Sequence, residues 1–412
     1  MVLSFQMHSR IFSPSVSAVS STATSFSSAA SNSVREFTRR GRVVVQASAV
    51  PSLPKVGSIP PVLGGLKAGF KKLCVVTGAS SGLGLDAAKV LADNDDYFVI
   101  CAVRNPEKMK KVAEERGFKS NKYAILSLDL ADQSSVKQFV FDLKAFKSNR
   151  PLDALVCNAA VYLPTDPNPQ FSKEGFEMSM AANHFGHFTL CNLLLEDMSR
   201  AKGARMIIVG SITGNSNTVG GGLVYPRADV GRFQGWQQQI DGVEGVSMID
   251  GKPFLGAKAY KDSKVCNMMT VSELHRRYHE STGITFSSLY PGCIAETALF
   301  REKREWFRKI FPLFMKYVTG GYVSQEEAGE RLAQVVTDPI CAKSGVYWSW
   351  NGGAKRVGLY DPKTGMVTGA GGSGGEIFEN DQSTQVTDLE QQKKMFDLSS
   401  KLVGVTWPKP KE

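Results

Sequence analysis

The sequence predicts an α/β fold, a single doubly wound domain of about seven mainly parallel strands with helices on both faces. Two observations support this prediction. From residue 72 onward, short apolar runs rich in β-branched residues alternate with segments of helical character, as expected for a parallel sheet buried on both faces. A glycine-rich turn, TGASSGLG at residues 77–84, directly follows the first of these runs. A hydrophobic content of 42% is sufficient for a sizeable core.

Each element follows from the residues between its turns. The apolar run at residues 72–76 is short and ends at the glycine-rich turn, which indicates a buried strand. The same reasoning predicts further strands at residues 97–103, 123–128, 154–157, 205–210, 285–289 and 345–350. Segments between them predict helices at residues 85–93, 108–116, 175–200 and 263–280. This strand–helix–strand alternation is typical of a Rossmann-type domain.

Composition divides the chain into three parts. Residues 1–50 contain thirteen Ser and five Arg but only one acid, Glu36, which favours a disordered plastid transit peptide over a generic disordered tail. Residues 51–70 are rich in Pro and Gly and predict a linker, so residues 71–412 form the folded Rossmann-type domain. The seven cysteines are scattered without a CxxC pair, and we expect neither a disulfide framework nor a metal site.

The formal net charge is +10, of which four charges belong to the first 50 residues. No basic stripe with interleaved aromatic residues stands out in the sequence, so we expect no nucleic-acid partner. An anionic cofactor, an acidic ligand or an anionic membrane surface would account for the excess. No run of 18 apolar residues occurs, and the sequence therefore predicts no membrane-spanning segment.

The glycine-rich turn predicts a dinucleotide site. A backbone that approaches a pyrophosphate closely needs residues without a Cβ atom, and the three glycines of the turn supply them between a strand and a helix. The N-terminus of that helix offers free N–H groups to the phosphates. We therefore expect cofactor contacts from Gly78, Ser80, Ser81, Gly82, Leu83 and Gly84.

The residues after the second strand select the cofactor. Arg104 stands where an NAD enzyme usually carries an acidic residue, and Lys108 follows one helical turn later. Two cations suit a ribose 2′-phosphate, which favours NADPH as the cofactor. The alternative interpretation is a solvated, basic start of the next helix.

The ends of the third and fourth strands extend the same site. Asp129, followed by Leu130, is a candidate to accept a hydrogen bond from the adenine amine, or alternatively to cap the next helix. Asn158, followed by Ala159, is expected to pin the backbone of the loop. All four residues are predicted to contact the cofactor.

A second constellation predicts reductase chemistry. Tyr260 and Lys264 are four residues apart on one helix face, where an ammonium would lower the pKa of the phenol. The same lysine is a candidate to hydrogen-bond the nicotinamide ribose, and both residues are also predicted to contact the cofactor. Ser211, at the end of the fifth strand, is a candidate to orient the substrate or the phenol. Asn183, inside a long helix, is a candidate to hold a water that connects Lys264 to solvent. The alternative for the Tyr–Lys pair is a chance surface pair.

Together, TGASSGLG, the NAA of residues 158–160, Asn183, Ser211 and YKDSK resemble the short-chain dehydrogenase/reductase family from about residue 73 to residue 350. One departure is informative. Ser211 and Tyr260 are 49 residues apart, whereas the family usually separates them by about a dozen. A connection of this length is usually functional, so residues 220–256 are interpreted as an insertion near the active site.

Further motifs narrow the resemblance. YPGCIAET after the sixth strand, YKDSKVCN, NHFGHF and the late WSWN resemble the light-dependent protochlorophyllide oxidoreductases, from about residue 71 to the C-terminus. The resemblance implies that Pro291 and Gly292 flank the nicotinamide. It also implies light-driven reduction of the C17–C18 double bond of protochlorophyllide, with a hydride from NADPH reaching C17 and a proton reaching C18. Tyr260 and Cys293 are both candidate proton donors, and the choice between them stays open.

The pigment is large, flat and carboxylated, and needs a broad apolar cleft with few polar anchors. Residues 301–322 are a candidate lid, in which Trp306 and Phe314 recur at helical spacing; an ordinary core helix and a membrane-surface helix are alternatives. Tyr290, Tyr225 and Cys293 are further candidates to line the cleft. The resemblance also implies a chloroplast protein, peripherally associated with internal membranes, and a homo-oligomer.

Two other functions share parts of this pattern. A light-independent short-chain reductase of a lipophilic, retinoid-like carbonyl would use the same nucleotide turn and Tyr–Lys pair. A non-enzymatic NADPH-binding scaffold would need neither Ser211 nor Tyr260. His184 and His187 are interpreted as helix residues beside the cleft rather than metal ligands, and residues 365–375 as a flexible surface loop.

Overall fold

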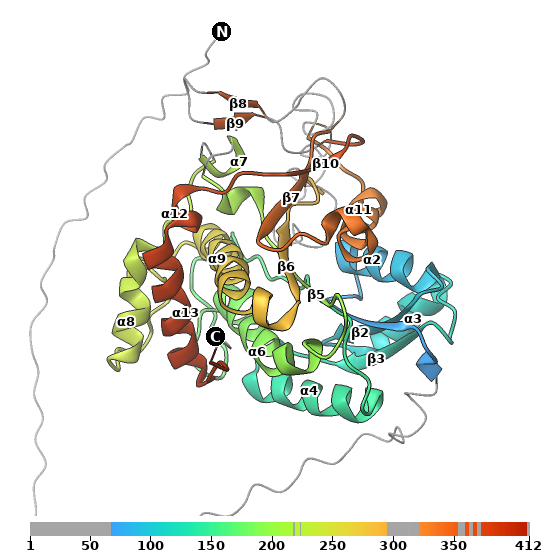
Figure 1. The fold of residues 1–412 in the computed structure, drawn as a ribbon. Coiled ribbons are helices and arrows are strands. Elements are labelled where there is room, and N and C mark those ends of the chain that lie inside the picture. The colour runs from blue at the N-terminus through green and yellow to red at the C-terminus, as the bar shows by residue number, and fades with distance from the viewer. Residues whose placement is uncertain are drawn as a thin grey trace, which may run out of the picture. The chain divides into compact units, whose positions relative to one another are not determined.

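The computed structural model describes residues 67–216, 219–222, 224–294, 313, 321–352, 359–361, 366–368 and 372–409 (Figure 1). The chain divides into two units, Met1–Gly57 and Ser58–Glu412, and every described residue belongs to the second. The predicted transit peptide at residues 1–50 and most of the predicted linker therefore lie outside the described residues.

An eight-stranded sheet forms the centre of the second unit, with its strands in the order β10-β7-β6-β5-β4-β1-β2-β3. The strands are β1 Lys72–Thr77, β2 Tyr97–Val103, β3 Tyr123–Ser127, β4 Ala154–Cys157, β5 Arg205–Val209, β6 Thr285–Leu289, β7 Val346–Trp350 and β10 Ile377–Glu379. The seven strands from β3 to β7 pair in parallel, whereas β10 pairs antiparallel with β7. The prediction of about seven mainly parallel strands is confirmed. The strand order reverses between β1 and β4, which is where such sheets bind ligands.

Helices cover both faces of the sheet (Figure 1). One face carries α2 Gly82–Asp93, α3 Pro106–Glu115 and α11 Gln325–Thr337, and the other carries α4 Gln133–Lys147, α6 Gly186–Met198 and α9 Gly256–Thr282. Side chains alternate across a strand, so Cys74 and Val76 of β1 enter the first core, and Leu73 and Val75 enter the second.

The helix predicted at residues 175–200 is interrupted near its start. A short α-helix, α5 Met178–Met180, leads into a π-helical turn, η1 Ala181–Phe185, and α6 follows. Turns of this kind occur often at functional sites, and this one contains Asn183. The predicted helix at residues 263–280 is confirmed as part of α9, which ends at Gly283 with a φ of 68°.

The predicted insertion contains short helices joined by loops. These are α7 Val219–Gly222, η3 Gly231–Phe233 and α8 Gln234–Ile240. The C-terminal helix α13, Leu389–Val403, packs against both α8 and α9. The Trp236 ring of α8 stacks on His184 with 5.6 Å between ring centroids. The insertion is therefore packed onto the body of the domain.

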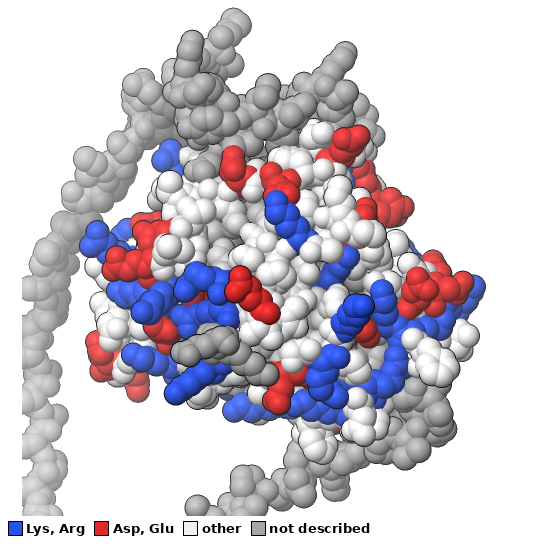
Figure 2. Space-filling view, in the orientation of Figure 1, with Lys and Arg blue, Asp and Glu red and all other residues white. Residues whose placement is uncertain are grey.

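The surface of the described domain mixes charges. On the face shown in Figure 2, Lys and Arg side chains gather over the lower half and are interspersed with Asp and Glu side chains. Among the described helices, none is both long enough and apolar enough to cross a bilayer.

Candidate active site

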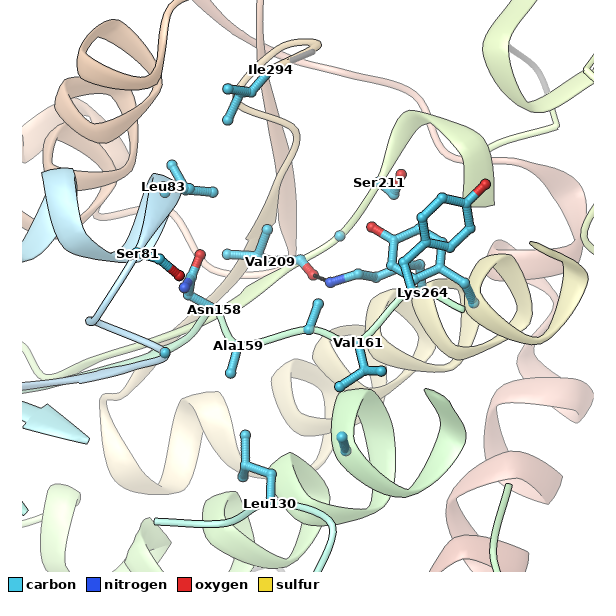
Figure 3. A pocket seen from close by; sticks show the side chains of 18 of the residues that line it. Ser81, Leu83, Leu130, Asn158, Ala159, Val161, Val209, Ser211, Lys264 and Ile294 are labelled. Atoms are coloured by element: carbon cyan, nitrogen blue, oxygen red, sulfur yellow. Dashed lines mark hydrogen bonds between the residues drawn. The ribbon is translucent and has the colours of Figure 1, made fainter. Parts of the chain in front are cut away.

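A pocket of about 400 Å³ opens at the carboxyl ends of the parallel strands. Its lining comes from the segments that follow β1 to β6 and from α9. In Figure 3, Ser81, Leu83 and Asn158 lie at one end, and Ser211 and Lys264 lie at the other. The predicted cofactor and catalytic residues that line it are Gly78, Ser80, Ser81, Gly82, Leu83, Gly84, Arg104, Asp129, Leu130, Asn158, Ala159, Ser211, Tyr260, Lys264, Pro291, Gly292 and Cys293.

The glycine-rich turn is packed so closely that two of its glycines have no room for a side chain. Gly78 has a φ of +70°, and a Cβ atom there would lie 2.9 Å from the Cα atom of Ala159. A Cβ atom at Gly84 would lie 2.3 Å from Nδ2 of Asn158. Ser81 precedes α2, and its side chain makes no capping hydrogen bond to the helix. Gly82, Leu83 and Gly84 of the first turn of α2 line the pocket beside Ser81, and the start of a helix suits a phosphate site.

Asn158 fixes this turn to the neighbouring strand, as the sequence predicted. Its Nδ2 donates to the carbonyl oxygen of Thr77 at 2.9 Å, and its backbone N–H donates to Oγ1 of Thr77 at 2.9 Å. Ala159 donates to the same hydroxyl at 3.0 Å. On its other side, Thr77 Oγ1 lies 2.9 Å from Nε2 of His187. Sequence reasoning missed Thr77 and read His187 only as a helix residue.

The two cations predicted to select the cofactor occupy different positions. Arg104 is exposed and lines the pocket, whereas Lys108 is exposed on α3 and is not among the lining residues. The backbone N–H of Lys108 donates to Oδ1 of Asn105, which caps α3. Arg104 is therefore the cation that faces the predicted ribose site.

Asp129 lines the pocket, but it does not cap the next helix. Its Oδ1 accepts from the N–H of Ala131 at 3.0 Å, and Asp132 caps α4 through the N–H groups of Ser134 and Ser135. The capping interpretation of Asp129 is therefore wrong, and a role beside the cofactor remains for it.

Tyr260 is half-buried at the catalytic end of the pocket. Its phenol hydrogen-bonds to Ser211, and its ring centroid lies 4.7 Å from that of Tyr162. Ser211 also lies 2.9 Å, between hydroxyl oxygens, from Thr213. Burial raises the pKa of Tyr260 well above its ordinary value, and the hydrogen bond from Ser211 opposes that rise. The phenol is thus protonated at neutral pH.

Lys264 lies on the same face of α9 but does not hydrogen-bond to the phenol. Its Nζ donates to the carbonyl oxygen of Val209 at 2.8 Å and lies 5.8 Å from the centroid of the Tyr260 ring. Burial lowers the pKa of Lys264 to about 8. The sequence predicted that this ammonium lowers the pKa of the phenol, and the structure differs because burial outweighs the more distant charge.

The side chain of Asn183 is held by three hydrogen bonds within the protein. Its Oδ1 accepts from the N–H of Val161 at 2.7 Å, and its Nδ2 donates to the carbonyl oxygen of Val161 and to Oγ of Ser263, both at 3.0 Å. Asn183 thereby joins the loop after β4 to the catalytic helix. The side chain thus positions the pocket wall, and the water that it is expected to hold beside Lys264 stays a prediction.

The turn after β6 brings Cys293 to the pocket. Of the seven cysteines, all of which are described, Cys293 alone is not fully buried. Its surroundings raise the pKa of its thiol to about 12, so the thiol stays protonated at neutral pH. Tyr290 lines the same wall, and burial raises the pKa of its phenol.

One predicted pigment contact falls outside the pocket, and two others lie outside the described residues. Tyr225 is 82% exposed and is not among the pocket-lining residues, because Lys261 of α9 holds the flanking carbonyl oxygens of Val224 and Pro226, both at 2.7 Å. The placement of Tyr225 in the cleft is therefore wrong for this structure. Trp306 and Phe314, with nearly all of the predicted lid at residues 301–322, lie outside the described residues.

Sequence reasoning also missed a group of pocket residues. Tyr162 packs against Tyr260, and Val161, Met178, Ala182 and Thr213 complete the wall beside it. Tyr162 lies two positions after the NAA of residues 158–160. Its position in the loop after β4 could therefore have indicated that it lines the pocket.

The residues present fit a nicotinamide dinucleotide. The pocket runs from a glycine turn without room for Cβ atoms to the Tyr260–Ser211 pair. The first end suits the phosphates of such a cofactor, and the second end suits its reacting ring. Arg104 and Asp129 lie at the ends of β2 and β3, where the adenosine half would bind.

Comparisons with known proteins agree with this arrangement. A family model described as short chain dehydrogenase matches residues 72–228. A crystal structure of an uncharacterized protein from Mycobacterium paratuberculosis superposes with a TM-score of 0.54 at 21% identity, and covers 82% of this chain and 96% of that chain. At this identity the likeness supports the fold alone.

Relatives of about 50% sequence identity share one enzyme name. The chain is 52% identical over 341 residues to a chloroplastic protochlorophyllide reductase of Marchantia paleacea, covering 82% of this chain and 69% of that protein. It is 49% identical over 383 residues to the chloroplastic protochlorophyllide reductase of Cucumis sativus, covering 92% and 89%. For protochlorophyllide reductase A of Arabidopsis thaliana, the identity is 50%, covering 80% and 76%. The chain therefore belongs to the protochlorophyllide reductase family of short-chain dehydrogenases.

Proposed function

We propose that this protein reduces the C17–C18 double bond of protochlorophyllide to give chlorophyllide, with NADPH as reductant and light as the driving input. The observation that carries the proposal is the site itself: Tyr260, Ser211 and Lys264 share one pocket with Cys293, in a chain about half identical to enzymes with this name. In this proposal the pigment itself absorbs the light.

Arg104 supports NADPH over NADH. It is the exposed cation at the end of β2, and it lines the pocket where the adenosine ribose would bind. A guanidinium suits a 2′-phosphate through two parallel hydrogen bonds. The glycine turn and the start of α2 would hold the pyrophosphate, and Asp129, Leu130 and Ala159 would flank the adenosine and its linkage.

When bound, the nicotinamide supplies the hydride that reaches C17 of the pigment. The residues of the chain supply the proton that reaches C18, so that the hydride and the proton together saturate the double bond. Tyr260 and Cys293 both carry a proton at neutral pH, because burial raises the pKa of each group. Ser211 orients the phenol, and Lys264 anchors the floor of the pocket through Val209.

The pigment would occupy the outer part of the pocket. Tyr290, Cys293 and Tyr162 form an aromatic and sulfur-containing wall there, which suits a flat apolar ring system. Trp306 and Phe314, in the lid at residues 301–322, are further pigment contacts in this proposal. The insertion at residues 220–256 would support the site from behind, through α9.

The relatives are named chloroplastic, and this chain is assigned to the chloroplast with them. Residues 1–50 would then act as the transit peptide, residues 51–70 as a linker and residues 71–412 as the catalytic domain. Peripheral association with internal plastid membranes and homo-oligomerisation complete the proposal.

The test mixes the full chain with protochlorophyllide and NADPH, and follows the absorption of chlorophyllide after illumination and in the dark. Product that appears only after illumination, and only slowly with NADH in place of NADPH, supports the proposal. Turnover of a retinoid-like carbonyl at the same rate in the dark as in the light would favour a light-independent reductase instead. NADPH binding without any turnover would favour a scaffold.

A further inference from the structure

Arg331 of α11 is a buried cation behind the turn that follows β6. Its side chain is 4% exposed. Nη1 donates to the carbonyl oxygen of Pro291 at 2.8 Å, and Nη2 donates to the carbonyl oxygens of Gly372 and Gly374 at 2.7 and 2.8 Å. One planar guanidinium therefore joins a pocket-lining turn to a second turn 80 residues further along the chain.

Glu327, one helical turn earlier on α11, completes this junction. Its Oε1 accepts from Nη2 of Arg331 at 2.7 Å and from the N–H of Gly374 at 2.7 Å. Its Oε2 accepts from the hydroxyl of Ser373 at 2.6 Å. Residues 372–374, which the sequence predicted as part of a flexible loop, are thus hydrogen-bonded to both members of the Arg331–Glu327 ion pair.

The turn that Arg331 contacts has little freedom of its own. Gly292 has a φ of +118°, and a Cβ atom there would lie 2.3 Å from Cγ2 of Val323 and 3.0 Å from Nη1 of Arg331. The N–H of Val323 donates to the carbonyl oxygen of Cys293 at 3.1 Å. Pro291, Gly292 and Cys293 line the pocket on one side, and Arg331 and Val323 close their other side.

We infer that Arg331, braced by Glu327, is a positioning residue that sets the place of Pro291, Gly292 and Cys293 in the active site. This inference rests on the proposed function for the identity of the groups that the turn faces. Arg331 touches neither the pocket nor any reacting atom in the described structure. It acts through the carbonyl oxygen of Pro291, so its loss would shift the turn and with it the Cys293 thiol.

The chemistry of the contact requires arginine. A guanidinium presents five donors in a fixed plane, so it can bind three carbonyl oxygens and a carboxylate together, whereas an ammonium has three donors at one point. The ring of Trp350 lies 5.2 Å from the guanidinium carbon and closes the remaining side. This contact gives a role to the late tryptophan motif, which the catalytic site does not use. Lysine in place of Arg331 keeps the charge but loses the geometry.

The experiment compares Arg331→Lys and Glu327→Gln with Arg205→Lys in the full chain. Arg205 is a matched control, because its Nη1 also donates to a backbone carbonyl involving α11, that of Val335, at 2.9 Å, yet Arg205 does not line the pocket. Three quantities are measured for each variant: the Kd for NADPH, the rate of Cys293 alkylation with and without NADPH, and the melting temperature. Cys293→Ser supplies the alkylation background.

We expect Arg331→Lys to raise the Cys293 alkylation rate and to weaken NADPH binding by roughly tenfold to a hundredfold, the range for losing a hydrogen bond to a charged group. Glu327→Gln should shift both quantities in the same direction by less. Arg205→Lys should change neither. The inference is overturned if Arg331→Lys lowers the melting temperature as Arg205→Lys does but leaves the alkylation rate and the NADPH affinity unchanged.

These readouts separate the inference from the proposed function. Alkylation and NADPH binding are measured without pigment or light, so failure of the wild-type chain to reduce protochlorophyllide would remove the proposed reaction and leave the result for Arg331 intact. Conversely, a wild-type chain that reduces the pigment, with an Arg331→Lys variant that does so equally fast and labels equally slowly, overturns the inference alone.

Discussion

The ammonium of Lys264 donates to the carbonyl oxygen of Val209 at 2.8 Å. This contact ties the catalytic helix to the end of β5, next to Ser211. Burial lowers the pKa of Lys264 to about 8, and it raises the pKa of Tyr260. At neutral pH the phenol of Tyr260 therefore keeps its proton. A protonated phenol suits a reaction in which the substrate takes up a proton.

The first prediction concerns this lysine. Lys264→Met should lower turnover by roughly a hundredfold or more, the usual range for loss of acid–base assistance. In the wild-type chain, the ammonium is present below about pH 8 and is lost as the pH rises through that value. NADPH affinity should therefore weaken above about pH 8, as measured by NADPH fluorescence between pH 6.5 and 9.5. An affinity that stays flat across this range would contradict a cofactor contact by Lys264.

The second prediction separates the two candidate proton donors. Tyr260→Phe and Cys293→Ser each remove a group that is protonated at neutral pH. The variant that lacks the donor should slow the proton-transfer step by roughly a hundredfold or more. This step then limits turnover, so its solvent deuterium isotope effect should be larger than in the wild type, with NADPH affinity almost unchanged. The other variant should retain the isotope effect. If both variants keep wild-type rates, neither residue is the donor.

Much of the site was predictable from sequence because it follows strand ends. Parallel strands end at one edge of a sheet, so motifs such as TGASSGLG, Asn158 and Ser211 meet there whatever the intervening loops do. Asn158 binds Thr77 as predicted. Strands β1, β2, β4, β6 and β7 were predictable because each is buried along its length or nearly so.

Other features depend on tertiary contacts that no local pattern reports. The contacts of the Asn183 amide with Val161 and Ser263, made from a π-helical turn, could not be predicted from the sequence. The pKa of Tyr260 follows burial, which is a property of the whole pocket. Tyr225 was placed in the cleft, but Lys261 holds its neighbours at the surface. Arg331 stood in an ordinary amphipathic helix pattern and gave no signal.

The third prediction concerns the choice of cofactor. Arg104→Ala should raise the Kd for NADPH by roughly tenfold to a hundredfold, the cost of losing a hydrogen bond to a charged group, and should leave the weaker binding of NADH almost unchanged. Lys108→Ala is the matched control, because Lys108 is equally exposed but does not line the pocket. Titration of each variant with both cofactors checks this. If neither substitution changes the Kd for NADPH, both residues belong to a solvated helix start. If both raise it equally, Lys108 also contacts the cofactor.

The fourth prediction concerns a buried histidine behind the glycine turn. Nδ1 of His187 lies 2.9 Å from the carbonyl oxygen of Asn183, which can only accept, so Nδ1 carries the proton and Nε2 accepts from the Thr77 hydroxyl. Burial lowers the pKa of His187 to about 4. The unfolded chain therefore binds this proton first, and the contribution of a neutral His187 to stability is lost as the pH falls from about 6.5 toward 4.

His187→Gln removes this titration. The difference in unfolding free energy between the wild type and the variant should shrink by up to about 1.4 kcal/mol for each pH unit below 6.5. Urea unfolding at several pH values between 4.5 and 7.5 measures it. A difference that does not depend on pH would show that His187 is not held in its neutral form.

The most direct test of the central claim follows the hydride itself. The full chain is incubated with protochlorophyllide and with NADPH that carries deuterium at both positions of nicotinamide C4, and the pigment is analysed by mass spectrometry before and after illumination. The account predicts chlorophyllide that carries one deuterium at C17, formed after illumination and not in the dark. Product without deuterium, equal product in the dark, or no product from a chain that binds NADPH and the pigment would contradict it.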